Sequence, residues 1–284
     1  MKIRPICSAT WTKLACGARS EFLAVTAATP TTGAVGQQPG PFVLVHCAWA
    51  GGWIWRDVAA RLRELGYTVF APTLSGMGEL QHLAQPDIDL DTHIADVVDL
   101  LTREDLHDVQ LIGWSYGGLV ISGVAEVVPE RLAQVMYLDA TVATDGQSGN
   151  DAERATAQEV AELAASGIAA GLPGFFTHDP SREWLAASMP DPAVRDWVLA
   201  NFTPHPMATY TQPLSLGNPD AASIPRTYIF CTEGKGDAAS DHSVSTLERL
   251  SHDPAWRVVQ VQDTHMAPVN HPVAIAELIA SLAR

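Results

Sequence analysis

No stretch of this sequence stays apolar for the ~18 residues that a membrane-spanning helix requires, so we expect a soluble protein without a membrane partner. Cysteine is scarce as well. The four cysteines, at positions 7, 16, 47 and 231, form no CxxC pair, which disfavours a disulfide framework or a zinc site and favours a reducing compartment, the cytoplasm. The ten histidines form no HExxH motif or Cys/His cluster, so no bound metal is expected.

Basic residues are also few: 17 Lys and Arg stand against 32 Asp and Glu, a formal net charge of −15. The first 40 residues hold four basic residues and one acidic residue, so the rest of the chain is more acidic still. This charge disfavours nucleic acids and anionic membranes as partners. Residues 1–40 lack the longer apolar core of a secretory signal, and we expect a loosely ordered N-terminal extension there.

Beyond residue 40, apolar strand patterns alternate with amphipathic helix patterns. The 284 residues, 47% of them apolar, are enough for one domain with a large core. Continuous apolar runs predict strands near 42–49, 67–74, 109–114, 134–140, 226–232 and 256–261. Such an alternation predicts an α/β fold with a mostly parallel sheet and helices on both faces.

Residues 144–223 interrupt this alternation with alanine-rich helical pieces, several prolines and many aromatic residues. We interpret them as a helical cap over the carboxyl edge of the sheet, where open α/β sheets bind their ligands. The core would then comprise residues 41–143 and 224–284. A helical excursion that only packs against the core is the alternative.

The sequence Gly113-Trp114-Ser115-Tyr116-Gly117 is a GxSxG motif between an apolar strand and an apolar helix. In that context Ser115 lies on a sharp turn with its hydroxyl above the sheet, as a nucleophile requires. His265 follows the last strand and can reach back to accept the proton of Ser115. The N–H groups of Tyr116 and Ala48 are the expected oxyanion donors.

Seven segments together resemble the esterase and hydroxynitrile lyase branch of the α/β-hydrolases, which includes plant methylesterases and bacterial relatives. They are VLVHCAWAGGWIW, PTLSGMGELQHL, GWSYGG, YLDATVATDGQS, TPHPMATYTQPL, TYIFCTE and THMAPVNHP. The resemblance implies the α/β-hydrolase fold, a small helical cap inserted after the sixth strand, the site residues named above, and no cofactor. It also implies a small apolar ester as substrate, in a pocket formed by Cys47, Trp49, Trp114 and Met266; a homodimer stays open.

Two positions near this pocket bear on the reaction. Esterases of the branch carry glycine where this chain has Cys47, and lyases often carry threonine there. Cys47 is therefore either a small buried residue or a weak donor that narrows the pocket. A lyase would also carry lysine directly after the catalytic histidine, where this chain has Met266, as the esterases do. We therefore favour ester hydrolysis.

The acid of a serine, acid and histidine triad has several candidates in this sequence. The family pattern places an aspartate directly after CTE, and this chain has Gly234 there. If GKG is a short insertion, Asp237 is the acid, and this is our first choice. Asp139, at the end of an earlier strand, is the alternative, and Glu233, Asp241 or no acid complete the set, because geometry rather than sequence position defines a triad.

The sequence therefore predicts a serine hydrolase that cleaves carboxylic esters of small to medium apolar compounds through an acyl-enzyme. Three alternatives stay open: lyase-type carbon–carbon cleavage by the same Ser/His pair, lactone hydrolysis, and an impaired enzyme that serves as a small-molecule receptor.

Overall fold

The computed structural model of the chain describes residues 21–22, 39–178 and 183–284, and a seven-stranded sheet forms its centre. The strand order is β1-β9-β8-β5-β4-β2-β3, and every described pair in this sheet is parallel. The strands are β1 (Glu21–Phe22), β2 (Phe42–Val45), β3 (Val69–Phe70), β4 (Val109–Trp114), β5 (Leu132–Leu138), β8 (Arg226–Cys231) and β9 (Trp256–Val261). The predicted α/β fold with its parallel sheet is confirmed.

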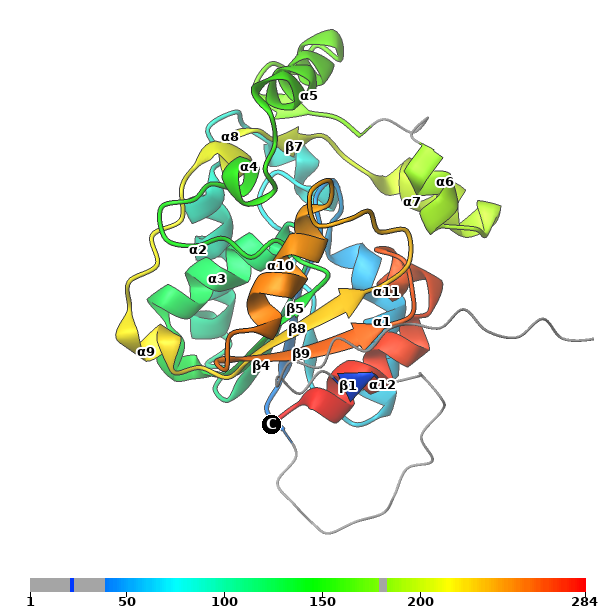
Figure 1. Cartoon of the computed structure of the whole chain (residues 1–284). Helices are drawn as coiled ribbons and strands as arrows, with labels where there is room; N and C mark the ends of the chain where they lie inside the picture. The colour runs from blue at the N-terminus through cyan, green and yellow to red at the C-terminus, as the bar shows by residue number, and fades with distance from the viewer. Residues whose placement is uncertain (1–20, 23–38, 179–182) are drawn as a thin grey trace, which may run out of the picture.

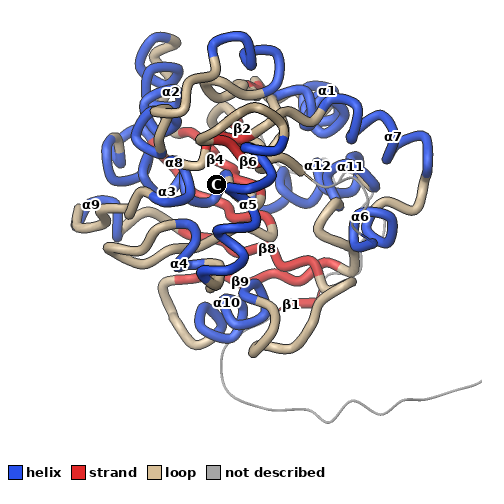
Figure 2. Tube along the Cα trace, turned by 90° about the horizontal axis from the view of Figure 1, so that it is seen from above, coloured by secondary structure: helices blue, strands red, loops and turns tan. Residues whose placement is uncertain are grey.

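Helices cover both faces of this sheet (Figures 1 and 2). One apolar cluster joins the sheet to α1 (Arg56–Glu64) and α12 (Pro272–Leu282), and the other joins it to α2 (Leu90–Arg103), α3 (Gly117–Val127) and α10 (His242–Ser251). All residues of β2 and β4 are buried, which explains why these strands are almost entirely apolar, with Gln110 of β4 as the exception.

The segment between β5 and β8 forms a separate layer, the cap layer, at the top of Figure 1, except for its last helix, α9 (Pro219–Ala222), which lies lower, beside the core. The cap layer contains α4 (Gly149–Ala152), α5 (Ala157–Ala169), α6 (Glu183–Ser188), α7 (Pro192–Asn201), α8 (Ala208–Thr211) and the antiparallel pair β6 (Phe175–Phe176) and β7 (His205–Pro206). Counted over the described residues, the layer follows the fifth strand, not a sixth as expected from the resemblance.

Two hydrogen bonds fix this cap layer to the carboxyl ends of β2 and β9. The N–H of Thr203 donates to the carbonyl of Trp49, in the loop after β2, over 2.8 Å. The Thr264 hydroxyl, in the loop after β9, donates to the carbonyl of Ser188, at the end of α6, over 2.9 Å. The cap layer therefore lies above the edge where the site residues are expected.

The N-terminal extension differs from expectation at two residues. Glu21 and Phe22 form β1, which pairs with Val259 and Gln260 of β9. An edge strand presents unpaired backbone groups, and β1 covers part of this edge of β9. The other residues of the expected extension, 1–20 and 23–38, lie outside the described part of the chain.

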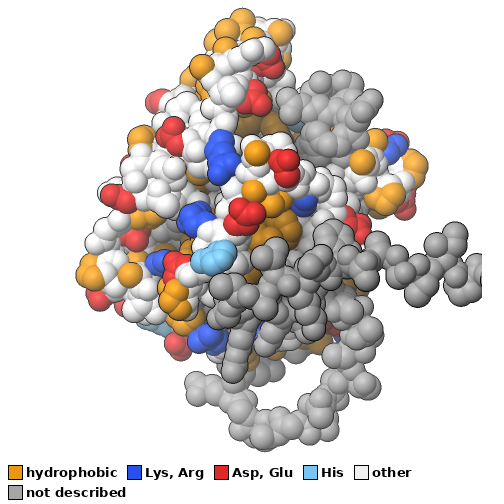
Figure 3. All heavy atoms as spheres, viewed as in Figure 1, with side chains coloured by type: hydrophobic (Ala, Val, Ile, Leu, Met, Phe, Trp, Pro, Cys, Tyr) orange, Lys and Arg blue, Asp and Glu red, His pale blue; other side chains and the backbone are white. Residues whose placement is uncertain are grey.

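The molecule's surface and helices bear on its expected partners. On the face seen in Figure 3, the visible Lys and Arg side chains lie among carboxylates and form no continuous basic patch. In the described part of the chain, no helix combines the length and the apolar character that crossing a bilayer requires.

Candidate active site

Ser115 lies on a sharp turn between β4 and α3. Its φ of 56° is in the left-handed region, which is strained for a residue with a side chain. Close packing makes this turn depend on glycine, since a Cβ on Gly113 would lie 2.4 Å from the carbonyl oxygen of Gly117. The N–H of Thr141 donates to the Ser115 carbonyl over 3.0 Å, which fixes the turn to the segment after β5.

The Ser115 side chain faces a cavity of about 420 Å³. Core and cap residues both line it, namely Ala48, Trp49, Ser115, Asp139, Thr141, Glu153, Ser188, Tyr210, Glu233, Gly234, Lys235, Ser240, Asp241, His242, Ser243 and His265. Another cavity, of about 340 Å³ beside α3 and α9, contains none of the predicted site residues. Ser115 and His265, both predicted from the sequence, therefore line the same cavity under the cap.

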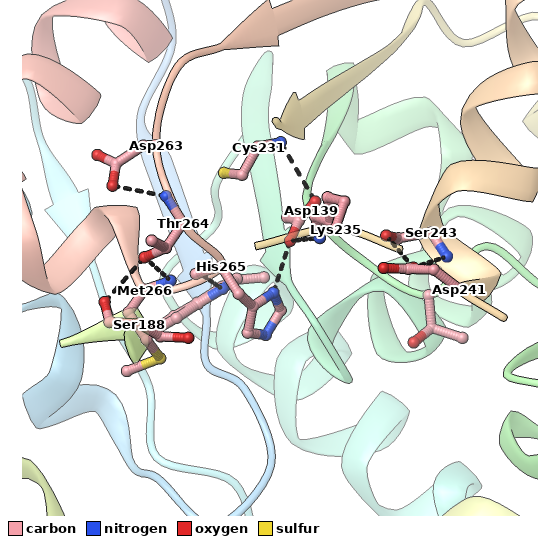
Figure 4. A network of polar contacts seen from close by, with 12 residues as sticks. Asp139, Ser188, Cys231, Lys235, Asp241, Ser243, Asp263, Thr264, His265 and Met266 are labelled. Carbon is pink, nitrogen blue, oxygen red and sulfur yellow. Dashed lines mark hydrogen bonds and ion pairs between the residues drawn. The ribbon is translucent and has the colours of Figure 1, made fainter. Parts of the chain in front are cut away.

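His265 is paired with Asp139 in this cavity (Figure 4). The imidazole Nδ1–H donates to Asp139 Oδ2 over 2.7 Å, and Oδ1 of the same carboxylate accepts the N–H of Cys231 over 3.2 Å. Burial by itself raises the pKa of Asp139, but the hydrogen bond from His265 and the charge of Lys235 outweigh it and lower that pKa to about 2. Asp139 is therefore ionised at neutral pH and holds the imidazole with Nε2 free to accept a proton.

Asp237, the first choice from the sequence, is not beside His265, and this corrects that preference. Asp237 Oδ1 accepts the N–H groups of Ala239 and Ser240, over 3.1 and 2.9 Å, and the Ser240 hydroxyl over 2.8 Å. These bonds close an exposed turn. The carboxylate is satisfied within its own loop, and it does not reach back to the sheet.

Asp241 and Glu233, the other two acids considered from the sequence, also make no hydrogen bond to Nδ1 of His265. Asp241 accepts the N–H of Ser243 over 2.9 Å and caps α10. Glu233 is exposed, and its N–H donates to the carbonyl of Asp263. Among the four carboxylates, the structure brings only Asp139 to His265 within the described part of the chain.

Ser115 and His265 share the cavity, but no hydrogen bond joins their side chains in the described structure. Catalytic hydrogen bonds are often long without a substrate and shorten in the complex. A hydrogen bond fixes the loop that carries His265 to the end of β4: the indole Nε1–H of Trp114 donates to the His265 carbonyl over 3.0 Å.

Ala48 and Tyr116, the predicted oxyanion donors, lie on the two loops that flank Ser115. Ala48 lines the cavity. In the described part of the chain, neither N–H group donates a hydrogen bond in a turn, loop or helix cap. Tyr116 is fully buried and is not among the residues that line the cavity, so the role of the two N–H groups as oxyanion donors stays a prediction.

Two buried histidines, which the sequence analysis did not single out, support the loop around Ala48. His46 accepts the N–H of Leu74 over 3.1 Å and donates from Nδ1 to the Cys47 carbonyl over 2.8 Å. His205, from the cap, accepts the N–H of Trp49 over 3.4 Å. Each ring needs one unprotonated nitrogen for these bonds. Accordingly, burial lowers the pKa of His46 to about 4 and lowers that of His205 well below its usual value.

The predicted pocket residues divide into two groups. Trp49 lines the cavity. Cys47, Trp114 and Met266 are only 6%, 0% and 2% exposed and belong to the apolar cluster on the α1 and α12 face, so their assignment to the pocket is corrected. Each follows or ends a strand with its side chain directed to the helix layer, which a linear sequence does not reveal.

The cavity also contains residues that the sequence analysis missed. Tyr210, Ser188 and Glu153, which directly follows α4, come from the cap, and Thr141 and Lys235 come from loops after strands. Thr141 donates its hydroxyl to Glu153 Oε1 over 2.7 Å, which gives one wall a fixed carboxylate. Within the described residues, no group of three or more His, Cys, Asp or Glu side chains is arranged to hold a metal ion.

The sequence matches the model of a family described as the alpha/beta hydrolase family over residues 42–278. It is 35% identical over 250 residues to a carbendazim hydrolyzing esterase of Nocardioides sp. (strain SG-4G), covering 85% of this chain and 98% of that protein. It is 26% identical over 257 residues to methylesterase 2 of Arabidopsis thaliana, covering 85% and 95%.

Solved structures agree. An extracellular alpha/beta-hydrolase from a Paenibacillus species superimposes with a TM-score of 0.73 at 26% identity, covering 87% of this chain and 100% of that one. That hydrolase is described as sharing structural and functional homology to tobacco salicylic acid binding protein 2. Tomato methylketone synthase I, at 20% identity and a TM-score of 0.65, shares the fold.

Proposed function

Because the chain belongs to the alpha/beta hydrolase family, we propose that it is a serine esterase that cleaves carboxylic esters of small to medium apolar compounds. Relatives named esterase and methylesterase, which align over 85% of the chain, support ester hydrolysis. The single observation that carries the proposal is one cavity that contains Ser115, on its strained turn, together with the His265–Asp139 pair.

In the proposed reaction His265 Nε2 takes the proton of the Ser115 hydroxyl while Oγ attacks the ester carbonyl. The tetrahedral intermediate collapses, His265 returns the proton to the leaving alcohol, and an acyl group remains on Ser115. Water, activated by the same imidazole, then hydrolyses the acyl-enzyme. The 420 Å³ cavity suits a substrate of modest size.

Asp139 acts through the imidazole in this proposal. Its hydrogen bond to Nδ1 selects the tautomer with Nε2 unprotonated, and its charge stabilises the imidazolium that forms during attack. The low pKa of Asp139 supports this role, because the carboxylate keeps its charge throughout the working pH range.

Ala48 and Tyr116 would stabilise the oxygen that becomes negative in the transition state. Removing one such donor costs about 3 kcal/mol of transition-state stabilisation in comparable sites. The positive end of α3, which begins directly after Tyr116, adds to the favourable potential.

Lyase-type cleavage loses its main support in this structure. That alternative depended on a Cys47 side chain at the substrate, and Cys47 is packed in the core. Lactone hydrolysis uses the same acyl-enzyme chemistry and differs only in the substrate. Comparing the rates of hydrolysis of γ-butyrolactone and of an open-chain ester distinguishes the two substrate classes.

The test is hydrolysis of p-nitrophenyl acetate and butyrate by the wild type and by Ser115→Ala. We expect kcat/KM to fall by at least about four orders of magnitude, because the nucleophile is lost. Ser281→Ala, an exposed serine on α12, is the matched control and should retain full activity. Undiminished turnover by Ser115→Ala would refute the proposal.

A further inference from the structure

Lys235 has an unusual place beside the paired histidine and carboxylate. It is the only lysine in the described part of the chain, since the two others are Lys2 and Lys13. Its side chain is only 13% exposed, and Nζ lies 2.6 Å from Asp139 Oδ2. The ammonium group also lies 5.3 Å from the centre of the Phe230 ring. Lysine is seldom enclosed in this way without a charged partner.

Two nitrogen donors therefore meet at one oxygen. His265 Nδ1 and Lys235 Nζ approach Asp139 Oδ2 over 2.7 and 2.6 Å, as the converging dashed lines of Figure 4 show. Because both nitrogens contact the same atom, they lie within about 5 Å of each other. At that separation, charges that are mostly shielded from water interact strongly.

We propose that Lys235 is a positioning residue for the catalytic pair: it holds Asp139 ionised and oriented, and it extends ester hydrolysis to lower pH by opposing protonation of His265. This inference rests on the proposed function, because it assigns a role to His265 as the base. It also gives a role to the loop after β8, which carries Gly234 at the family's acid position and places Lys235 beside Asp139.

The charge of Lys235 acts on both members of the pair. The Asp139 side chain has no exposed surface, so ionisation there requires nearby positive charge or strong donors, and Lys235 is the only lysine or arginine side chain that contacts it in the described structure. The same ammonium group repels a proton on His265. Without it, the full charge of Asp139 would favour imidazolium, which cannot accept the Ser115 proton.

The other ionisable groups around the pair do not replace Lys235. Cys231 and Tyr228, on β8, are buried beside Asp139, and burial raises the pKa of both, so they stay neutral. Asp241, at the start of α10, interacts electrostatically with Lys235. The remaining charged or titratable residues that line the cavity are Glu153, Tyr210, Glu233 and His242, and burial raises the pKa of Tyr210 well above its usual value.

Gly234 makes the approach of Lys235 possible. Its φ of 72° is in the region that glycine adopts without strain, and the space around it is open. The chain turns at this point, directly after the CTE segment, and the following side chain enters the cavity. Glycine at the family's acid position therefore matches the arrangement in which Asp139 and Lys235 act together.

The experiment measures kcat/KM for p-nitrophenyl acetate between pH 5 and 9 in the wild type, Lys235→Met, Lys235→Gln and Lys235→Arg. In the two neutral variants we expect the acidic limb of the profile to move up by about one pH unit. Activity at pH 6 should then fall about tenfold, with a smaller loss at pH 8. Lys235→Arg should retain most of the wild-type profile, because it keeps the charge.

Arg103→Met is the control for net charge, because Arg103 is exposed and pairs with Glu104 away from the cavity. An acidic limb that stays in place in the neutral variants, or moves to lower pH, would overturn the proposal. Failure of both neutral variants to fold would also overturn it, by making Lys235 a structural requirement. A wild type without esterase activity would instead contradict the proposed function.

Discussion

At the scale of single residues, the position of Asp139 decides how the site works. It follows the last residue of β5 with a φ of 43°, which turns the carboxylate away from the strand direction. The N–H of Asp139 donates to the Ile229 carbonyl over 2.7 Å, and its Oδ1 accepts from Cys231, so two bonds to β8 hold it. The acid is therefore mounted on the sheet and not on a flexible loop.

Asp139→Asn should lower kcat/KM for p-nitrophenyl butyrate by about three to four orders of magnitude, because an amide selects the wrong imidazole tautomer. Asp237→Asn is the matched control. Its carboxylate only closes an exposed turn, so its activity should stay within about threefold of the wild type. The reverse ranking of the two variants would restore Asp237 as the acid.

The sequence could identify Ser115 and His265 because each follows a strand that is recognisable on its own. It could not select the acid, because that choice depends on contacts between residues far apart in the chain. Asp139 meets Lys235 across 96 positions and His265 across 126. The hydrogen bonds of Asp237 are local, but the sequence around Asp237 does not show that they satisfy its carboxylate.

At the scale of elements, the junction between β4 and α3 sets the position of Ser115. Three glycines, Gly113, Gly117 and Gly118, lie where a side chain would collide with backbone. On Gly118, a Cβ would lie 2.3 Å from the carbonyl oxygen of Thr141. The motif is therefore a packing requirement between strand and helix as much as a chemical signature.

Gly113→Ala tests this requirement. The added methyl group would lie 2.4 Å from the Gly117 carbonyl oxygen, so β4 and α3 must separate. We expect a loss of about 2 kcal/mol or more in the free energy of unfolding by urea, together with a large loss of activity. Gly217→Ala, where nothing lies within 4 Å, should change stability by less than about 0.5 kcal/mol. Equal effects of the two substitutions would contradict the argument.

At the scale of the whole molecule, the core has two apolar layers and a small group of buried histidines between core and cap. His46, His93 and His205 are completely buried. His93 accepts the Tyr116 hydroxyl over 2.8 Å and donates to the Ser75 carbonyl over 2.9 Å. Desolvation lowers the pKa of His93 to about 4, so this ring is neutral in the folded protein, as are the other two.

Acid should therefore unfold the protein. In the unfolded chain these histidines have a pKa of about 6.5. Between pH 6.5 and 4 the unfolded state binds more protons, and stability falls as pH falls, by up to about 1.4 kcal/mol per pH unit for each histidine. Urea midpoints at pH 7.5, 6 and 5 check this. Equal midpoints would contradict it, and His252→Gln, an exposed histidine, should follow the wild type.

The fold was easier to predict than the site because its signal repeats along the chain. Strands buried on both faces are apolar at most positions, as Val43, Leu111 and Ile229 illustrate, so each strand is recognisable by itself. The directions of Cys47, Trp114 and Met266 were not predictable, because the burial of a side chain depends on which layer its strand turns it toward.

The most direct test of the central claim is to locate the covalent intermediate. We would treat the protein with a serine-directed phosphonate, measure its intact mass, and map the modified peptide by mass spectrometry. The account predicts a single adduct on Ser115 that forms in step with the loss of esterase activity and is absent from Ser115→Ala. Full inactivation with Ser115 unmodified, or esterase activity that survives complete modification of Ser115, would contradict it.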